Sequence, residues 1–217
     1  MIDLHTHSIL SDGELVPSEL AIRAEKYGYN TIGITDHVDF SNYKYVVKSI
    51  LEFDKRFRKS SNILTIPGVE VTYVPPPLIP EFVNEIRGLG IKLILVHGET
   101  IAETVPEETN LYALKSDIDI LAHPGLITRD LVKIAKEKGI YLEITARKGH
   151  SLSNGNVAKL ALDVGANLVI NTDTHTTDNL ISKEKAIKVG LGAGLSIKDI
   201  EQAFINSENL VNKIINK

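Results

Sequence analysis

Short apolar segments alternate with longer amphipathic segments along the whole chain. The apolar segments are Met1–Leu4, Thr31–Thr35, Ile63–Val74, Lys92–Val96, Ile118–Ala122, Ile140–Thr145 and Asn167–Asn171. They are rich in β-branched residues and lack strict alternation, which is typical of strands buried on both faces of a parallel sheet. Seven strand–helix units with no polar linker predict a single α/β domain over residues 1–217, folded as a closed or nearly closed TIM-like barrel.

An open doubly wound sheet is the alternative architecture. No glycine-rich dinucleotide fingerprint and no Walker phosphate loop follows any of the predicted strands. One loop stands out, the triple proline at 75–77 with Pro80 close behind. It predicts either a stiff polyproline rim beside a pocket or a simple chain reversal.

Three helices have recognisable ends. Pro17 fits the first turn of a helix that stops near Gly28. Ser153 is a candidate N-cap for a helix that ends at Gly165. The pair at 207–208, Ser-Glu, predicts the start of a last helix running toward Ile215.

Composition excludes several classes of protein. The 217 residues are 43% hydrophobic and 24% charged, as in ordinary globular proteins, and the net charge of −4 gives no global attraction to nucleic acid. The absence of Cys excludes disulfides, thiolate metal sites and a thiol nucleophile. No long apolar run and no basic leader occurs, so we expect a cytoplasmic protein without membrane contact.

Polar residues gather where the predicted strands end, which is where β/α barrels carry their functional groups. In chain order these residues are His5, His7, Asp36, His37, Glu70, His97, His123, Arg147, His150, Asp173 and His175. All seven histidines are among them, and none falls on a predicted helix. Scattered core or surface histidines would not sort in this way.

These residue types are suited to binding metal. The pairs His5/His7 and Asp173/His175 each put two side chains on one face of a strand, because side chains repeat every second residue. Glu70 inside an apolar run is costly unless it is paired or bound to a cation. Taken singly, each has a plain structural explanation, but together they predict a site for more than one divalent ion, namely Zn, Mn or Fe.

The order of motifs also resembles a known family. The motifs are HTHSILSDG from residue 5, TDH at 35–37, GVE at 68–70, VHG at 96–98, AHPG at 122–125 and TDTH at 172–175. This pattern, which spans nearly the whole chain, is similar to that of the polymerase and histidinol phosphatase (PHP) family. The resemblance implies a distorted seven-stranded β/α barrel with two to three metal ions at the C-terminal ends of its strands.

The resemblance also implies how nine ligand positions divide among the ions. The first ion would be held by His5, His7, Glu70 and Asp173, the second by Glu70, His97 and His123, and the third by Asp12, His37 and His175. Glu70 would thus bridge two ions.

Such ions would reverse the local charge of an acidic protein and attract phosphate. A hydroxide between two ions would be the nucleophile, because metal binding lowers the pKa of water to about 7. Glu70 and Asp173 are therefore expected to be catalytic through the ions. In the segment TARKGHS, Arg147 and Lys148 would contact the phosphate, and His150 would contact it or protonate the leaving oxygen. A solvated basic turn is the alternative.

We therefore predict a metal-dependent phosphoesterase acting on a small phosphorylated metabolite, with histidinol phosphate as one candidate. A nuclease is the second hypothesis, since the family includes domains of DNA polymerases, but the chain shows no stacking platform for single strands. A non-catalytic module is the third, and loss of ligands would be its mark.

Overall fold

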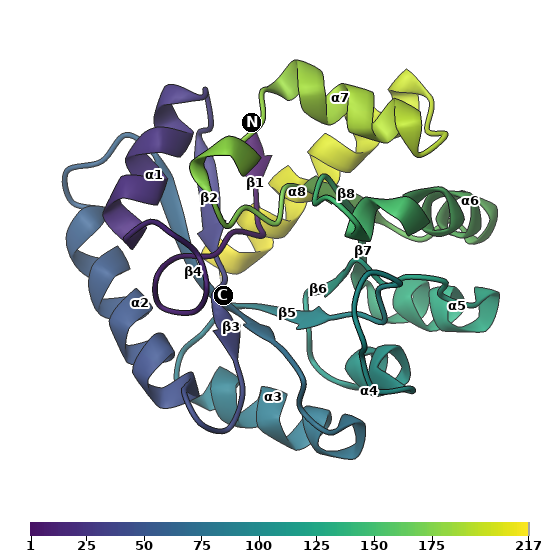
Figure 1. Cartoon of the computed structure of the whole chain (residues 1–217), viewed down its shortest axis with the longest axis horizontal. Helices are drawn as coiled ribbons and strands as arrows, with labels where there is room; N and C mark the ends of the chain where they lie inside the picture. The colour runs from purple at the N-terminus through teal and green to yellow at the C-terminus, as the bar shows by residue number, and fades with distance from the viewer. Residues whose placement is uncertain (217) are drawn as a thin grey trace.

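Parallel strands surround a central axis and helices cover them on the outside, as seen in the computed structural model, which describes residues 1–216 (Figure 1). The strands are β1 (Ile2–Asp3), β2 (Thr31–Ile34), β3 (His37–Val38), β4 (Leu64–Val71), β5 (Leu93–His97), β6 (Ile120–Ala122), β7 (Tyr141–Thr145) and β8 (Leu168–Asn171). Hydrogen bonding follows the order β1-β2-β4-β5-β6-β7-β8, with the short β3 beside β4. The predicted nearly closed seven-stranded barrel is confirmed.

Closure between β1 and β8 is made at one end only. A single parallel bridge joins Thr6 to Thr174. The His7 amide donates to the Thr174 carbonyl (2.8 Å), and the Asp173 amide donates to the His5 carbonyl (2.9 Å). The contact therefore brings the first and last polar segments of the chain together.

Helices alternate with the strands and form the outer layer. They are α1 (Pro17–Lys26), α2 (Tyr43–Phe57), α3 (Ile79–Gly88), α4 (Thr109–Lys115), α5 (Arg129–Lys138), α6 (Asn154–Val164), α7 (Lys183–Gly192) and α8 (Ile197–Ile215). As predicted, Pro17 opens α1, and Gly165 ends α6 in the left-handed conformation.

Three local predictions were wrong. The last helix begins at Ile197 and not at 207, because its N-cap Ser196 forms a reciprocal capping box with Asp199, and Ser207 lies buried inside the helix. Ser153 precedes α6 but does not cap it, since its hydroxyl donates to the His150 carbonyl instead. The triple proline forms neither a polyproline rim nor a simple reversal. It leads through a 3-10 turn (Pro76–Leu78) directly into α3.

The inside of the barrel is filled at the end opposite the closure contact. The residues packed there are Leu4, Ile66, Leu93, Leu95, Ile120, Ala122, Val169, Leu210, Val211 and Ile214. The last three belong to α8, which crosses behind the strands in Figure 1 and is tied to β8 by a hydrogen bond from Asn206 to the Leu168 carbonyl (2.8 Å). Apolar side chains of α8 thus close the amino-terminal end of the barrel.

Strand alternation carries polar groups to the other end. In β5, Leu93 and Leu95 pack in the inner cluster while Ile94 and Val96 pack against the helices. The next inward position is His97, and the same alternation points Glu70 inward from β4 and Glu143 inward from β7. The inner apolar layers therefore end in a layer of ligand-type side chains.

Candidate metal centre

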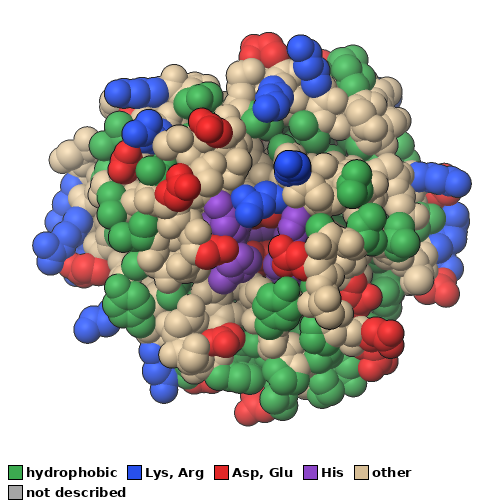
Figure 2. Space-filling model, in the orientation of Figure 1, with side chains coloured by type: hydrophobic (Ala, Val, Ile, Leu, Met, Phe, Trp, Pro, Cys, Tyr) green, Lys and Arg blue, Asp and Glu red, His purple; other side chains and the backbone are tan. Residues whose placement is uncertain are grey.

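Histidine side chains gather in a hollow at the centre of one face of the molecule, with acidic and basic groups around them (Figure 2). The hollow is a cavity of about 420 Å³. It is lined by Ser11, Asp12, His37, Val38, Asp39, Ser41, Asn42, Thr72, Tyr73, His97, Glu103, Arg147, His150, Asp173 and His175. Its volume is in the range of small-molecule sites.

The four residues expected to hold the first ion converge beneath this cavity. The Nε2 atom of His5 lies 3.2 Å from Glu70 Oε2 and 3.7 Å from Asp173 Oδ1. The Nε2 atom of His7 lies 3.5 Å and 3.3 Å from the same two oxygens. All four side chains are buried. Two imidazole nitrogens and two carboxylate oxygens thus face one point.

Glu143, which sequence reasoning missed, supports this set from below. It is fully buried, and its Oε1 accepts hydrogen bonds from His5 Nδ1 and Asn171 Nδ2, both at 2.8 Å. Its Oε2 accepts from the His123 amide (3.1 Å). Because a carboxylate can only accept, His5 Nδ1 carries a proton and Nε2 is left to face the other carboxylates. A Glu within an apolar segment, as at Glu70, was the available signal.

The residues expected at the third ion also come together, with one addition. The carboxylate of Asp12 lies 3.2 Å from His175 Nε2 and 3.8 Å from His37 Nε2. It also faces Nδ1 of His7, the ring nitrogen that does not face the first set. These four side chains form one group with potential ligand atoms less than 4.8 Å apart. His7 therefore stands between the first and third sets.

Asp36 is not part of any of these groups. Its buried carboxylate accepts hydrogen bonds from the amide and hydroxyl of Ser8 (2.7 and 2.8 Å) and of Ser11 (3.1 and 2.8 Å). It thereby fixes the loop that carries Asp12. Gly13 allows that loop to turn back, because a Cβ there would lie 2.4 Å from the His7 carbonyl oxygen.

The set expected at the second ion is only partly assembled. His123 Nε2 lies 3.6 Å from Glu70 Oε1, but His97 groups with His123 and His150 and not with Glu70. Glu103, from the loop after β5, lies 3.4 Å from His97 Nε2. Sequence reasoning did not single out Glu103, since nothing in its loop distinguishes it from a solvated acid.

Unpaired polar atoms support a cation site. Among residues 1–216, the buried side-chain nitrogen and oxygen atoms without a hydrogen-bond partner all belong to His5, His7, Glu70, His97, His123 and His150. Buried polar atoms are normally paired, so a cluster of unpaired lone pairs is costly without a cation among them. The donor set of imidazole and carboxylate fits Zn, Mn or Fe.

The pKa values show the same need for positive charge. Burial opposes a charge on His5, yet the carboxylates of Glu143 and Glu70 outweigh it and hold the pKa of His5 well above its ordinary value. Burial raises the pKa of Asp173 to about 6. Burial lowers the pKa of His7 and of His123 well below the ordinary value.

The three residues predicted to contact the phosphate, Arg147, Lys148 and His150, lie in different surroundings. Arg147 lines the cavity, and its guanidinium donates to Asn179 Oδ1 (3.1 Å) and to the Asp173 carbonyl (3.4 Å). Lys148 is exposed and does not line the cavity. His150 is buried at the start of a 3-10 turn (His150–Ser153), and burial lowers its pKa. Its Nε2 lies 3.3 Å from Glu103 Oε1, and its role toward the phosphate or the leaving oxygen stays a prediction.

A buried group of ligand-type residues at the carboxyl ends of barrel strands is the arrangement of a candidate metal site, and comparison with known proteins places the chain in a family. The family model described as PHP domain matches residues 3–115, just over half of the chain. The chain belongs to the PHP domain family.

Relatives include proteins of two named activities. "Uncharacterized protein MJ1295" of Methanocaldococcus jannaschii is 46% identical over 206 residues, covering 94% of each chain. The "DNA polymerase/3'-5' exonuclease PolX" of Bacillus subtilis is 28% identical, over 82% of this chain but only 35% of its own length. "Probable phosphatase Teth514_1060" of Thermoanaerobacter sp. is 27% identical over 90% of this chain and 87% of its own.

Solved structures share the fold at low identity. A chain from an archaeal ribonuclease P structure with mature tRNA superposes with a TM-score of 0.74 at 18% identity, covering 99% of this chain and 91% of its own. The histidinol phosphate phosphatase of Lactococcus lactis, complexed with Zn, L-histidinol and phosphate, gives 0.62 at 16% identity, covering 88% and 91%. Within residues 1–216, no helix combines the length and apolar character that crossing a membrane requires.

Proposed function

We propose that this protein is a metal-dependent phosphoesterase that hydrolyses a phosphate monoester of a small metabolite. The observation that carries the proposal is the set of unpaired buried nitrogen and oxygen atoms directly beneath the cavity. The phosphatase names of several relatives support it. Two to three ions, held mainly by the nine expected ligands, would polarise the phosphate and lower the pKa of a bound water.

The chain's own residues would bind and orient the ester. Arg147 lines the cavity with a planar guanidinium, which matches two phosphate oxygens. Its hydrogen bond to Asn179 holds it in that position. Lys148 would contribute only long-range attraction, because its side chain is exposed and outside the cavity.

Charge at the mouth would still favour an anion. Asp12, Glu70 and Asp173 would neutralise part of the ionic charge, and Glu143 and Glu103 offset more of it than the sequence alone suggests. Three dications and Arg147 carry +7, which exceeds the −6 of these five carboxylates and Asp39, another residue of the cavity lining. The attraction is confined to the cavity, so it suits a small phosphate ester better than a long polyanion, which needs an extended basic track.

A nuclease is the second candidate, favoured by the 28% identity to the polymerase and exonuclease of Bacillus subtilis. A screen decides between the two. Protein loaded with Mn or Zn is assayed against a panel of phosphate monoesters and against short single-stranded oligonucleotides. We expect monoester hydrolysis that a chelator abolishes. Strong exonuclease activity without monoesterase activity in the same preparation would refute the proposal.

A further inference from the structure

Tyr73, which is not among the expected metal ligands, forms part of the cavity wall. It follows β4 and is 55% exposed. Five further lining residues come from the ends of β3 and β4 and the segments after them, namely Val38, Asp39, Ser41, Asn42 and Thr72. A cavity of about 420 Å³ is large enough for a whole small-molecule ligand and not only for its phosphate. This part of the wall is therefore available to the rest of an ester.

The backbone holds Tyr73 in a costly conformation. Its φ is 53°, in the left-handed region that bulky L residues rarely adopt. Both neighbours fix the chain at this point, because the Thr72 amide donates to the Val38 carbonyl (3.0 Å) and the Val74 side chain is buried. Such strain persists only where the surrounding structure imposes it, and it is concentrated at ligand sites. Here the strained residue is the one that places an aromatic ring at the cavity.

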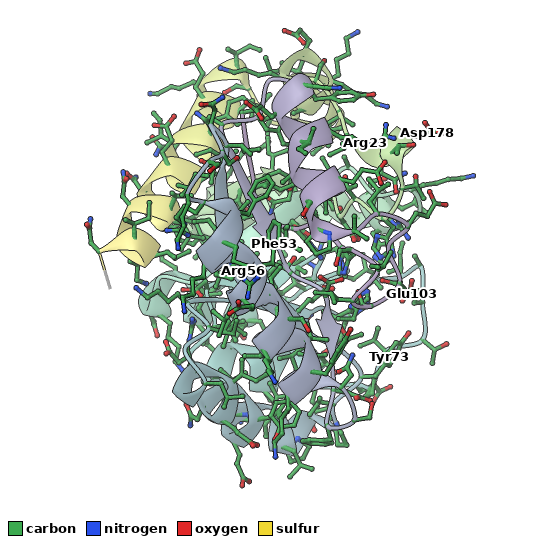
Figure 3. All side chains as sticks on the ribbon, turned by 90° about the vertical axis from the view of Figure 1, so that its left-hand side faces the viewer. Arg23, Phe53, Arg56, Tyr73, Glu103 and Asp178 are labelled. Carbon is green, nitrogen blue, oxygen red and sulfur yellow. The ribbon has the colours of Figure 1, made fainter. Side chains whose placement is uncertain are left out.

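Two contacts set the direction of the Tyr73 ring. Its hydroxyl donates to Glu103 Oε2 (3.2 Å), and Figure 3 shows the two residues together at the edge of the molecule that carries the cavity. The ring also lies nearly parallel to the imidazole of His97, with centroids 5.8 Å apart and 26° between the planes. A fixed and exposed aromatic ring offers a stacking surface to another planar group, and such contacts stabilise beyond the area that they bury.

Carboxylates give this part of the cavity a negative character. Asp39 lines the cavity, and its Oδ1 accepts hydrogen bonds from the Ser41 amide (2.7 Å) and hydroxyl (2.6 Å), which fix its position. Glu103 lines the cavity beside Tyr73. Arg147, the one Lys or Arg in the lining within residues 1–216, donates instead to the Asp173 carbonyl. A leaving group with its own negative charge is therefore disfavoured next to Asp39.

We propose that Tyr73 selects the leaving group of the ester by stacking on it. The inference rests on the proposed function and names its substrate class, phosphate monoesters whose leaving group is a planar ring without negative charge. The phosphate lies at the metal centre, the ring of the leaving group lies against Tyr73, and Asp39 disfavours leaving groups that carry a carboxylate or a second phosphate. Tyr73 determines specificity and takes no part in bond cleavage.

Ligand binding tests the inference without turnover. Protein loaded with Zn²⁺ is titrated by calorimetry with phenylphosphonate, with cyclohexylphosphonate, which is similar in size but not planar, and with 4-carboxyphenylphosphonate. The variants are Tyr73→Ala, Tyr73→Leu, Tyr73→Phe and Asp39→Asn. The control is Tyr45→Ala, the same substitution at an exposed position of α2. Affinities are compared as ratios within each variant, so a change in metal loading affects all three ligands alike.

Each variant has a distinct expected result. The wild type and Tyr45→Ala should bind phenylphosphonate about 2- to 10-fold more tightly than cyclohexylphosphonate, as one aromatic contact predicts. Tyr73→Ala and Tyr73→Leu should lose this preference, whereas Tyr73→Phe should keep it because the ring remains. The wild type should bind the carboxylated ligand about 5-fold more weakly than phenylphosphonate, and Asp39→Asn should reduce that difference.

Several results would overturn the inference. A wild type without preference for the planar ligand, or without affinity for any of the three, would do so, as would a preference that Tyr73→Ala retains. Equal loss in Tyr73→Phe and Tyr73→Ala would show that Tyr73 acts only by holding Glu103. An unchanged difference in Asp39→Asn would remove Asp39 from the selection. A wild type that binds phenylphosphonate as expected but hydrolyses no phosphate ester would refute the proposed function and leave the stacking site intact.

Discussion

The carboxylate of Glu143 offers the sharpest test of how the fold prepares the metal centre. Glu143→Gln keeps the shape of the side chain but replaces one accepting oxygen with an NH₂ group. Both oxygens of Glu143 now accept from donors, Oε1 from His5 and Asn171 and Oε2 from the His123 amide. Whichever way the Gln amide is turned, its NH₂ group faces another hydrogen-bond donor. The substitution also removes the negative charge that fixes the tautomer of His5.

Loss of a partner of this kind costs about 10- to 100-fold in metal affinity, or about 1.4 to 2.8 kcal/mol. We expect that loss at the ion bound by His5 and His7, measured by competition with a chromophoric chelator well below the melting temperature. Glu137→Gln is the control, because it is the same substitution at an exposed position of α5. A folded Glu143→Gln protein with wild-type affinity at every site would show that Glu143 does not position His5.

Three further outcomes follow from the same geometry. Glu70→Gln should nearly abolish kcat. Arg147→Ala should instead raise KM about 10- to 150-fold, which corresponds to the loss of one charge-assisted contact. Unchanged kinetic constants in the Arg147 variant would favour the interpretation of this segment as a solvated turn. Ion content after dialysis should fall as pH falls from about 8 to about 5, because protons compete for neutral imidazole, and pH-independent content would contradict imidazole ligation. Leu210→Ala should destabilise the protein by about 2–5 kcal/mol in chemical denaturation with metal content unchanged; loss of metal would mean that the apolar plug also supports the centre.

The barrel was predictable because two features of the sequence indicate each strand. Each apolar segment is flanked by helical pattern, and a residue type that apolar cores do not carry lies after its end, as at His97, or within it, as at Glu70. Strand alternation then places those residues inward, which is what the structure shows. The start of α8 was misplaced because Ser207 resembles a cap, whereas the residue that caps the helix, in reciprocal bonds with Asp199, is Ser196, eleven residues earlier.

The support of the centre could not be predicted in the same way. Glu143 and Glu70 both interrupt apolar segments, and only the register of β7 against β8, with Glu143 opposite Val169, decides that Glu143 lies beneath His5. Glu103 lies in a loop of polar residues, where no periodicity assigns a direction to a side chain. His150 was predicted to be functional, but the direction of its side chain depends on the left-handed turn at Gly149. The positions of Glu103 and His150 are set by loop packing, for which a single sequence carries no repeating signal.

The placement of His123 shows how contacts within the fold offset the backbone strain at a candidate ligand. Ile120 and Ala122 of β6 point inward, so regular alternation would send His123 outward into the helical layer. Its backbone instead has φ of 26°, a region that costs a non-glycine residue about 1–3 kcal/mol. The bond from its amide to Glu143 offsets that cost, and Gly125 lets the following turn close against the loop after β5, since a Cβ there would lie 1.8 Å from the Glu99 carbonyl oxygen. Backbone strain, a buried carboxylate and close loop packing thus meet at one candidate ligand, which is the pattern of a site held ready for a cation rather than of a histidine that merely fills space in the core.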